Sequence, residues 1–206
     1  MERPDFVHLH LHSEYSLSDG IIRIKELVSR ASSLQYSAVG LTDLTNLFGL
    51  LEFYRSSREK GIKPIVGAEV NVIKDKDSLP APIVLLVKDK QGYINLTKIV
   101  SKAYVDGQVN GEPMVELSLL QKYSEGLIAL SGGMEGHVGQ SILAGNIPLT
   151  ESRIKFFKSI FDEDFFIEVH RLGKTNEEEY NNAAVDIATK MDVPIVATNN
   201  VRFLMP

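Results

Sequence analysis

Apolar residues follow two alternating patterns along the chain. Short apolar runs, typical of buried strands, alternate with longer stretches in which apolar residues recur every three or four positions, typical of amphipathic helices. We expect strands at 6–12, 38–43, 63–73, 83–87, 127–131, 165–170 and 194–198. We expect helices at 21–34, 47–60, 91–104, 116–122, 137–143, 150–161 and 177–191.

This alternation predicts an α/β fold with parallel strands and helices packed outside them. The strand at 38–43 begins with residues that are apolar on both faces, as in a buried parallel strand. A closed barrel and an open, doubly wound sheet both fit the pattern. No repeat or linker divides the chain, so we expect one domain over residues 1–206. Residues 201–206 are mostly apolar and follow a strand directly, which predicts a fragment of a longer polypeptide.

The charge balance and the absence of cysteine narrow the function classes. Lys and Arg number 22 against 27 Asp and Glu, so the net charge is -5, which disfavours a domain that binds DNA phosphates by itself. Without cysteine the 206 residues have no disulfide, no thiolate metal site and no cysteine nucleophile. No apolar run reaches the roughly 18 residues of a membrane helix, and residues 1–5 do not resemble a signal peptide. We expect a soluble, cytoplasmic protein with no membrane partner.

Candidate chemistry is expected where strands end, because α/β folds place functional residues at the carboxyl ends of their strands. The first strand carries His8, His10 and His12. Residues two apart on a strand share a face, so these imidazoles line up on one side. Two neighbouring imidazoles can bind one metal ion through nitrogen. The alternative interpretation is a set of polar residues at a barrel mouth.

Three carboxylates near strand ends admit two interpretations each. Glu69 lies in a strand of Val and Ile, where a carboxylate must be paired with a base, bound to metal or at an exposed end. Asp43 is interpreted first as an N-cap for the helix that follows, and Asp19 stands in a turn that also suits a cap. His137 and His170 stand alone and are predicted to be structural. Residues 131–133 are predicted to form a turn.

The opening FVHLHLHSEYSLSDG, residues 6–20, resembles the start of bacterial replicative DNA polymerase III α subunits. Those proteins begin with a PHP (polymerase and histidinol phosphatase) domain. Further matching segments are 41–43, 46–49, 52–54, 61–67, 126–132 and 196–199, so the resemblance covers nearly the whole chain. It implies a TIM-like (β/α)7 barrel of the PHP type with parallel strands and outer helices, here truncated at the C-terminus. The resemblance therefore favours a barrel over an open sheet.

The resemblance also implies a metal site that is largely lost. Intact family members hold three metal ions through nine ligands and hydrolyse phosphoesters. The matching ligand positions kept in this sequence are His10, His12, Asp19 and Glu69. The other ligand positions carry residues that bind metal poorly or not at all, namely Leu44, Pro82, Gly133, Asn200 and Arg202. Hydrolysis needs ions that share ligands and activate water, so we predict a vestigial site, weak or empty, and no catalytic residue.

Arg202 brings a fixed positive charge to a strand end where metal ligands are missing. A guanidinium pairs with carboxylates in bidentate fashion. We therefore predict that Arg202 neutralises Glu69 or Asp19 and takes over the structural role of a metal ion.

The implied function is that of a supporting domain in a replicative polymerase. The parent chain would perform template-directed DNA synthesis with Mg²⁺, while this domain supports the polymerase and docks the proofreading exonuclease (ε) subunit. The implied partners are the rest of the polymerase chain, other replicase subunits, and DNA through other domains. The alternative is a residual phosphoesterase, either a pyrophosphatase or a 3′–5′ exonuclease, with one weakly bound Zn²⁺, Mn²⁺ or Mg²⁺ ion. A free-standing enzyme like histidinol phosphatase fits least.

Overall fold

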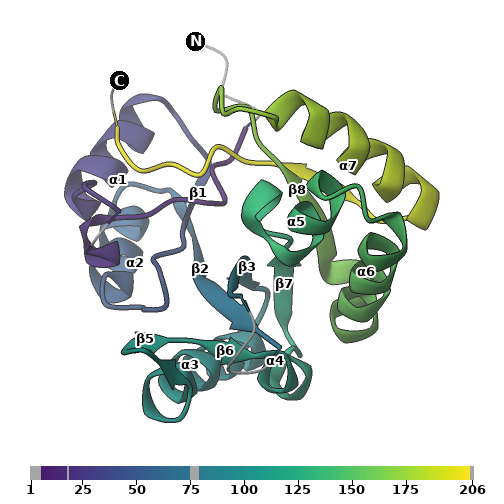
Figure 1. The fold of residues 1–206 in the computed structure, drawn as a ribbon. Coiled ribbons are helices and arrows are strands. Elements are labelled where there is room, and N and C mark those ends of the chain that lie inside the picture. The colour runs from purple at the N-terminus through teal and green to yellow at the C-terminus, as the bar shows by residue number, and fades with distance from the viewer. Residues whose placement is uncertain (1–5, 18, 75–78, 205–206) are drawn as a thin grey trace. The chain divides into compact units, whose positions relative to one another are not determined.

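A computed structural model describes residues 6–17, 19–74 and 79–204 (Figure 1). The chain forms two compact units. Unit 1 comprises Met1–Glu69 and Asn199–Pro206, and unit 2 comprises Val70–Thr198. No helix in the described part of the chain is long and apolar enough to span a membrane.

In its described residues, unit 1 contains two α-helices, one 3-10 helix, one short strand and the start of a long strand. Its elements are η1 (Glu14–Ser16), α1 (Ile24–Ser33), β1 (Ala38–Leu41), α2 (Leu50–Glu59) and the first residues of β2 (Lys63–Ile73). β1 and β2 run parallel, with Ala38 opposite Lys63 and Leu41 opposite Val66. The apolar residues that recur at helical spacing in α1 face inward. They form the core of unit 1 together with Phe53 of α2. This packing fixes the ends of β1 and β2.

The first expected strand is irregular in the structure. Residues 6–12 lie in no named strand, and Leu11 makes only an isolated parallel bridge with Val201. The segment is nevertheless tied to its neighbours, because His8 O accepts from Gly40 N at 2.7 Å and Leu11 O from Thr42 N at 2.9 Å. These two hydrogen bonds are three residues apart along the histidine segment, so they do not form the regular pattern of a strand pair. They nevertheless hold the histidine segment beside β1.

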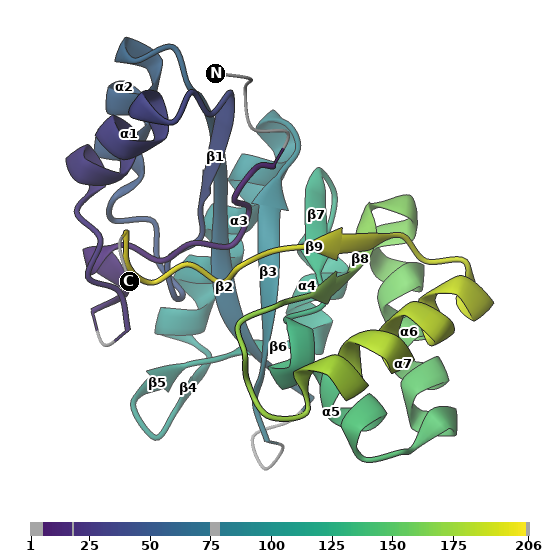
Figure 2. The ribbon, with the colours of Figure 1, turned by 90° about the horizontal axis from the view of Figure 1, so that it is seen from above.

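Unit 2 holds most of the sheet, as Figure 2 shows. Its strand order is β2-β3-β7-β8-β9, and β6 pairs with β2. The strands that follow β2 are β3 (Ala81–Val87), β4 (Gln108–Val109), β5 (Glu112–Pro113), β6 (Val115–Glu116), β7 (Leu127–Leu130), β8 (Phe165–Val169) and β9 (Ile195–Ala197). The helices are α3 (Lys90–Val105), α4 (Leu117–Tyr123), η2 (Gly133–Glu135), α5 (His137–Leu143), α6 (Ile147–Phe161), η3 (Asp162–Asp164) and α7 (Glu177–Met191).

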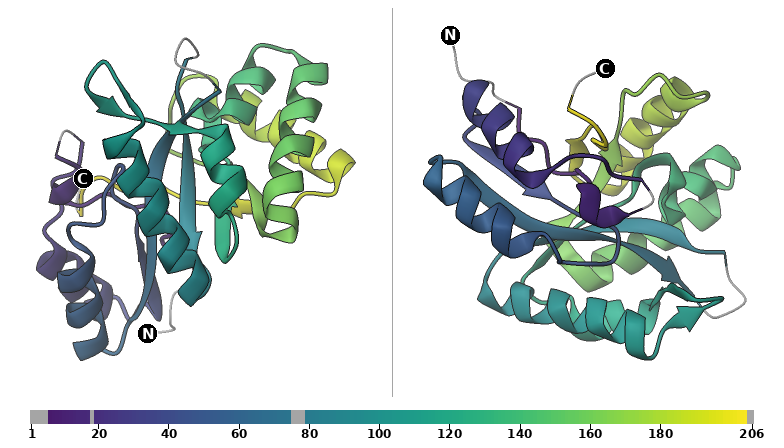
Figure 3. Two further views of the ribbon diagram at one scale, coloured as in Figure 1. Left: turned by 90° about the horizontal axis from the view of Figure 1, so that it is seen from below. Right: turned by 90° about the vertical axis from the view of Figure 1, so that its left-hand side faces the viewer.

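One strand pair of unit 2 departs from the expected parallel arrangement. β7 with β8 and β8 with β9 are parallel, but β3 and β7 are antiparallel, with Val84 opposite Leu130. Only residues 74–80 separate β2 from β3, and a parallel crossover needs about a dozen residues or more. The chain therefore reverses into β3. In Figure 3, α3 lies along the strands of unit 2, and it packs on β3 and β7.

His137 at the start of α5 provides a pH-dependent contribution to stability. Its Nε2 donates to the carbonyl oxygen of Val72 at 3.1 Å, and Arg153 donates to the His137 carbonyl. Burial lowers the pKa of His137, and the charge of Arg153 adds to the effect. Below about pH 6.5 the unfolded chain binds a proton that the folded chain refuses, so the free energy of unfolding falls as the pH falls.

We expect His137→Gln to lose less stability than the wild type between about pH 7 and pH 5.5. Urea denaturation at the two pH values measures the difference. Gln140→Ala, on the exposed side of the same helix, is the control and should keep the wild-type pH dependence. Equal pH dependence in His137→Gln and the wild type would show that His137 is not responsible.

Candidate metal centre

His10, His12 and Glu69 form one buried cluster in unit 1. His10 Nε2 lies 2.6 Å from Glu69 Oε2, and His12 Nε2 lies 3.6 Å from the same oxygen. One potential ligand atom from each residue lies within 4.8 Å of the other two. The sequence-based expectation that His10 and His12 share a face therefore agrees with the geometry. Of the interpretations of Glu69, pairing with a base is found: both histidines contact its carboxylate, and Arg202 lies within ion-pair distance.

The backbone explains why Glu69 faces the histidines. Glu69 forms an isolated parallel bridge with Leu44, and its carbonyl accepts from Thr45 N at 2.7 Å. Burial alone would raise the pKa of the Glu69 carboxyl, but hydrogen bonds and charge interactions with His10 and His12 lower that pKa well below its usual range. The carboxylate is therefore charged and needs a positive partner in the cluster.

His8 does not belong to this cluster. Its Nε2 lies 3.2 Å from the Tyr36 hydroxyl, and its Nδ1 is buried without a hydrogen-bond partner in the described part of the chain. Burial lowers the pKa of His8. The expected row of three imidazoles is thus found for His10 and His12 only, because His8 lies against Tyr36 instead.

Arg202 reaches the cluster from the last described segment of unit 1. Its guanidinium contacts the Asp19 carboxylate and His12 Nδ1, and its Nη2 lies 3.9 Å from Glu69 Oε2. Arg202 Nε donates to Asn200 Oδ1 at 2.8 Å. The predicted pairing of Arg202 with Asp19 is confirmed. Asp19 is not a helix cap, because Arg23 stands at the N-cap of α1.

The contacts of His12 decide whether it can bind metal. Asp19 Oδ1 lies 3.0 Å from His12 Nδ1, and the Arg202 guanidinium contacts that same nitrogen. A protonated Nδ1 donates to Asp19 and leaves a lone pair on Nε2, which is the tautomer that binds metal. An unprotonated Nδ1 accepts from Arg202 and puts the proton on Nε2. Arg202 and a metal ion therefore favour opposite tautomers of His12.

The donor set fits one ion better than three. His12 Nε2 is buried with no hydrogen-bond partner among the described residues, and it points at the carboxylate of Glu69. Two imidazole nitrogens and one carboxylate oxygen match a single zinc-type site. Leu44, whose backbone bridges to Glu69, offers no lone pair, and the amide oxygen of Asn200 is engaged by Arg202.

The two other degenerate positions belong to unit 2. Pro82 lies in β3, and Gly133 begins η2 with a positive φ of 59°. A Cβ atom at Gly133 would lie 2.5 Å from Cε1 of His170. The predicted turn at residues 131–133 is present, because Gly132 also has a positive φ.

Asp43 does not cap the next helix, contrary to the first interpretation. Its carboxylate accepts from Ser13 N at 2.6 Å, from Ser13 Oγ at 2.8 Å and from Ser16 Oγ at 2.7 Å. The helix α2 starts only at Leu50, with Gly49 at its N-cap, so a loop separates it from Asp43. Asp43 instead holds the turn that follows the histidine segment.

A second buried polar cluster lies in unit 2. Glu168 Oε1 accepts from Thr198 Oγ1 at 2.5 Å and lies 3.3 Å from His170 Nε2, while Glu168 Oε2 accepts from Gly132 N at 3.1 Å. The prediction that His170 stands alone is wrong, because it pairs with Glu168. The spacing of two residues between Glu168 and His170 on one strand was the available indication.

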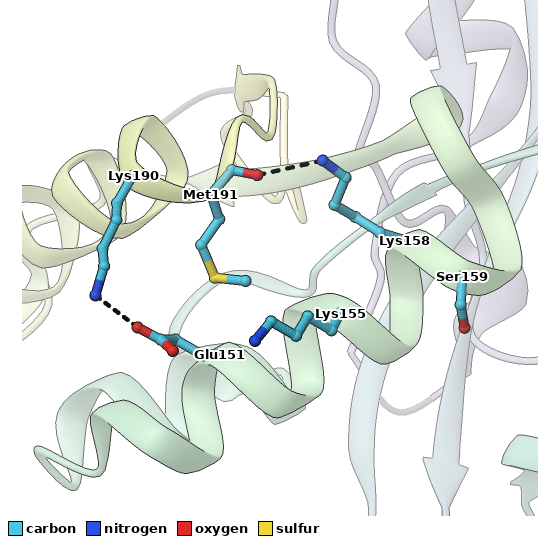
Figure 4. A pocket seen from close by; sticks show the side chains of 6 residues that line it. All are labelled: Glu151, Lys155, Lys158, Ser159, Lys190 and Met191. Atoms are coloured by element: carbon cyan, nitrogen blue, oxygen red, sulfur yellow. Dashed lines mark hydrogen bonds and ion pairs between the residues drawn. The ribbon is translucent and has the colours of Figure 1, made fainter.

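A shallow hollow of about 620 Å³ lies between α6 and α7 of unit 2 (Figure 4). Lys190 pairs with Glu151 at 2.6 Å across it. Lys158 donates to the carbonyls of Met191 and Asp192, which are groups at the C-terminal end of α7. Lysines in this position stabilise the helix end. These contacts join α6 to the C-terminal end of α7.

Comparison with known proteins identifies the family. The PHP domain model matches residues 8–172, so the chain belongs to the PHP domain family. Over 206 residues it is 43% identical to DNA polymerase III subunit alpha of Escherichia coli and 40% identical to that of Vibrio cholerae. Each alignment covers 99% of this chain and 18% of the relative, so the chain spans about a fifth of the relatives' length.

Solved structures show the same fold. A putative metal-dependent phosphoesterase from Bifidobacterium adolescentis matches with a TM-score of 0.62 and 14% identity, covering 98% of this chain and 90% of the other. An amidohydrolase from Chromobacterium violaceum matches with a TM-score of 0.62 and 16% identity, covering 95% and 87%. The expected α/β fold of the PHP type is confirmed.

Proposed function

We propose that this chain is the N-terminal PHP domain of a replicative DNA polymerase α subunit and acts there as a metal-depleted scaffold. It supports the polymerase and docks the proofreading exonuclease (ε) subunit. The observation that carries the proposal is the Arg202 guanidinium, which contacts Asp19 and His12 beside the buried Glu69. The similarity to polymerase α subunits supports the same assignment.

The chemistry of the cluster favours support over hydrolysis. A guanidinium neutralises carboxylates and fixes their orientation, but it has no exchangeable coordination position and does not generate hydroxide from water. A bound divalent ion would supply that Lewis acidity, and His10, His12 and Glu69 are the residues that would hold it. In this structure the Arg202 guanidinium contacts His12 and Asp19, so the positive charge beside the cluster comes from a side chain of the protein.

The polymerase activity belongs to the parent chain in this proposal. DNA synthesis uses Mg²⁺ held by carboxylates in a polymerase domain, and DNA is bound through other domains as well. The net charge of -5 suits contacts with proteins better than contacts with phosphates. The same assignment implies that the parent protein acts in the cytoplasm together with other replicase subunits.

The second candidate function is a residual phosphoesterase with one Zn²⁺, Mn²⁺ or Mg²⁺ ion. The unpartnered, buried Nε2 of His12 favours it, because a metal ion would satisfy that atom. The first solved structure described above is also named a metal-dependent phosphoesterase. This function requires Arg202 to leave His12, at the cost of leaving Asp19 without its guanidinium partner.

The two functions are separated by assays on the full-length parent protein. We expect primer extension with Mg²⁺, no change in the melting temperature of this domain with chelator, and no stoichiometric zinc or manganese by elemental analysis. Gel filtration should show co-elution with the exonuclease subunit. Absence of primer extension would reject the polymerase assignment. Hydrolysis of a phosphodiester that persists in Gln140→Ala but disappears in His12→Ala would establish the phosphoesterase instead.

A further inference from the structure

We propose that four exposed apolar side chains of unit 1 form the surface on which the remainder of the parent polymerase chain docks. This apolar rim consists of Leu17, Ile21, Phe48 and Phe203. The inference rests on the proposed function, because it takes the chain to be the N-terminal part of a polymerase subunit. It deepens that function by naming the supporting surface.

The exposure of the rim is unusually large for such side chains. Leu17 is 81% exposed, Ile21 77%, Phe48 66% and Phe203 56%. Single exposed apolar residues are common on protein surfaces, but several that gather at one place mark an interaction site. The four side chains can act as one interaction site only if their segments lie beside one another.

Backbone hydrogen bonds bring their three segments together. Ile21 N donates to the Arg202 carbonyl at 3.4 Å, which places Ile21 beside the residue that precedes Phe203. The Asn46 amide donates to the Tyr15 carbonyl at 2.9 Å, and Phe48 N donates to Asn46 Oδ1 at 3.1 Å. Leu17 follows η1 directly and bonds back to it. These bonds place the segments that carry Leu17, Ile21, Phe48 and Phe203 beside one another, as one docking surface requires.

The rim is also held in a fixed arrangement. Asp43 binds the hydroxyls of Ser13 and Ser16 and so fixes the η1 turn that carries Leu17. Arg202 binds Asp19 and so ties residues 19–21 to the segment that carries Phe203. Binding to such a surface loses less conformational entropy, because the backbone segments that carry its side chains are already held together. The ion pair between Arg202 and Asp19 therefore also holds together two of the segments that carry the rim.

We take the segment that covers the rim to be the parent's own chain beyond residue 206. The curated relatives extend far beyond the aligned segment, which is 18% of their length. Phe203 is among the last described residues of unit 1, so in the proposed parent the chain that follows is near this surface at high effective concentration. Interfaces between domains of one chain bury about 600–1,500 Å², to which each phenylalanine adds about 150–250 Å².

Hydroxyl-radical footprinting of the full-length wild-type protein tests the docking, because it measures side-chain exposure directly. We expect Leu17 and Phe48 to be oxidised several-fold less than their exposure in unit 1 alone implies. Leu79, which is also 81% exposed but lies in unit 2, is the matched control and should be oxidised readily. In Leu17→Glu we expect oxidation of Phe48 to rise, while Leu79→Glu leaves it unchanged.

Every other outcome overturns the inference. Oxidation of Leu17 as fast as Leu79 in the full-length protein means that nothing covers the rim. Protection that appears only with added exonuclease subunit assigns the rim to that partner, and protection that grows with protein concentration assigns it to a second copy. Primer extension by the same preparation keeps the two proposals apart: extension with an uncovered rim rejects only the docking surface.

Discussion

Replacing Asp43 by alanine is expected to lower the free energy of unfolding by about 3–5 kcal/mol, since hydrogen bonds to a charged group contribute roughly 1.5–3 kcal/mol each. The Asp43 carboxylate is buried and accepts from Ser13 N, Ser13 Oγ and Ser16 Oγ. Alanine leaves these donors without an acceptor. Urea denaturation followed by circular dichroism measures the loss.

Two control variants test the cause. Asp43→Asn keeps one oxygen acceptor without the charge and should lose less stability than Asp43→Ala. Asp186→Ala, an exposed carboxylate on α7, should change the free energy of unfolding by less than about 0.5 kcal/mol. Equal losses for Asp43→Ala and Asp186→Ala would contradict a role of Asp43 in holding the turn.

Replacing Arg202 by methionine is expected to lower the free energy of unfolding by about 2–3 kcal/mol, less than a fully buried pair would lose. Methionine keeps an apolar stem but removes the charge that Asp19 and the buried Glu69 share. The side chain of Arg202 is 25% exposed, so water compensates part of the loss.

The same variant should acquire a response to zinc. Without Arg202, His12 Nδ1 is free to donate to Asp19, and its Nε2 lone pair joins His10 and Glu69 as a donor. Added Zn²⁺ should then raise the melting temperature of Arg202→Met and leave the wild type unchanged. Arg30→Met on the exposed side of α1 is the control. A zinc response of the wild type equal to that of Arg202→Met would show that Arg202 does not compete with metal.

The predicted elements agree with the structure where the local pattern decides them. The strands expected at 83–87 and 127–131 appear as β3 and β7, and the helix expected at 177–191 is α7. The direction of β3 was not predictable from its apolar residues, which are the same in a parallel and an antiparallel strand. The short connection between β2 and β3 carried that information.

The sequence predicts which residues belong to the candidate cluster, but it predicts only some of the contacts that they make. The period of two residues places His10 and His12 on one face, whatever the rest of the chain does. Asp43 suited a cap, but the serines that bind it lie about thirty residues earlier in the chain. Arg202 and Asp19 are 183 residues apart, so their pairing followed from family resemblance rather than from local pattern.

Gly133 has a consequence for how such a domain can evolve. A side chain there would need the strained positive φ of 59° and would collide with His170, which its pairing with Glu168 holds in place. Restoring a ligand at this position thus requires at least two coordinated changes, and the first alone would destabilise the protein. A side chain at residue 133 therefore becomes compatible with the fold only when His170 moves or is replaced at the same time.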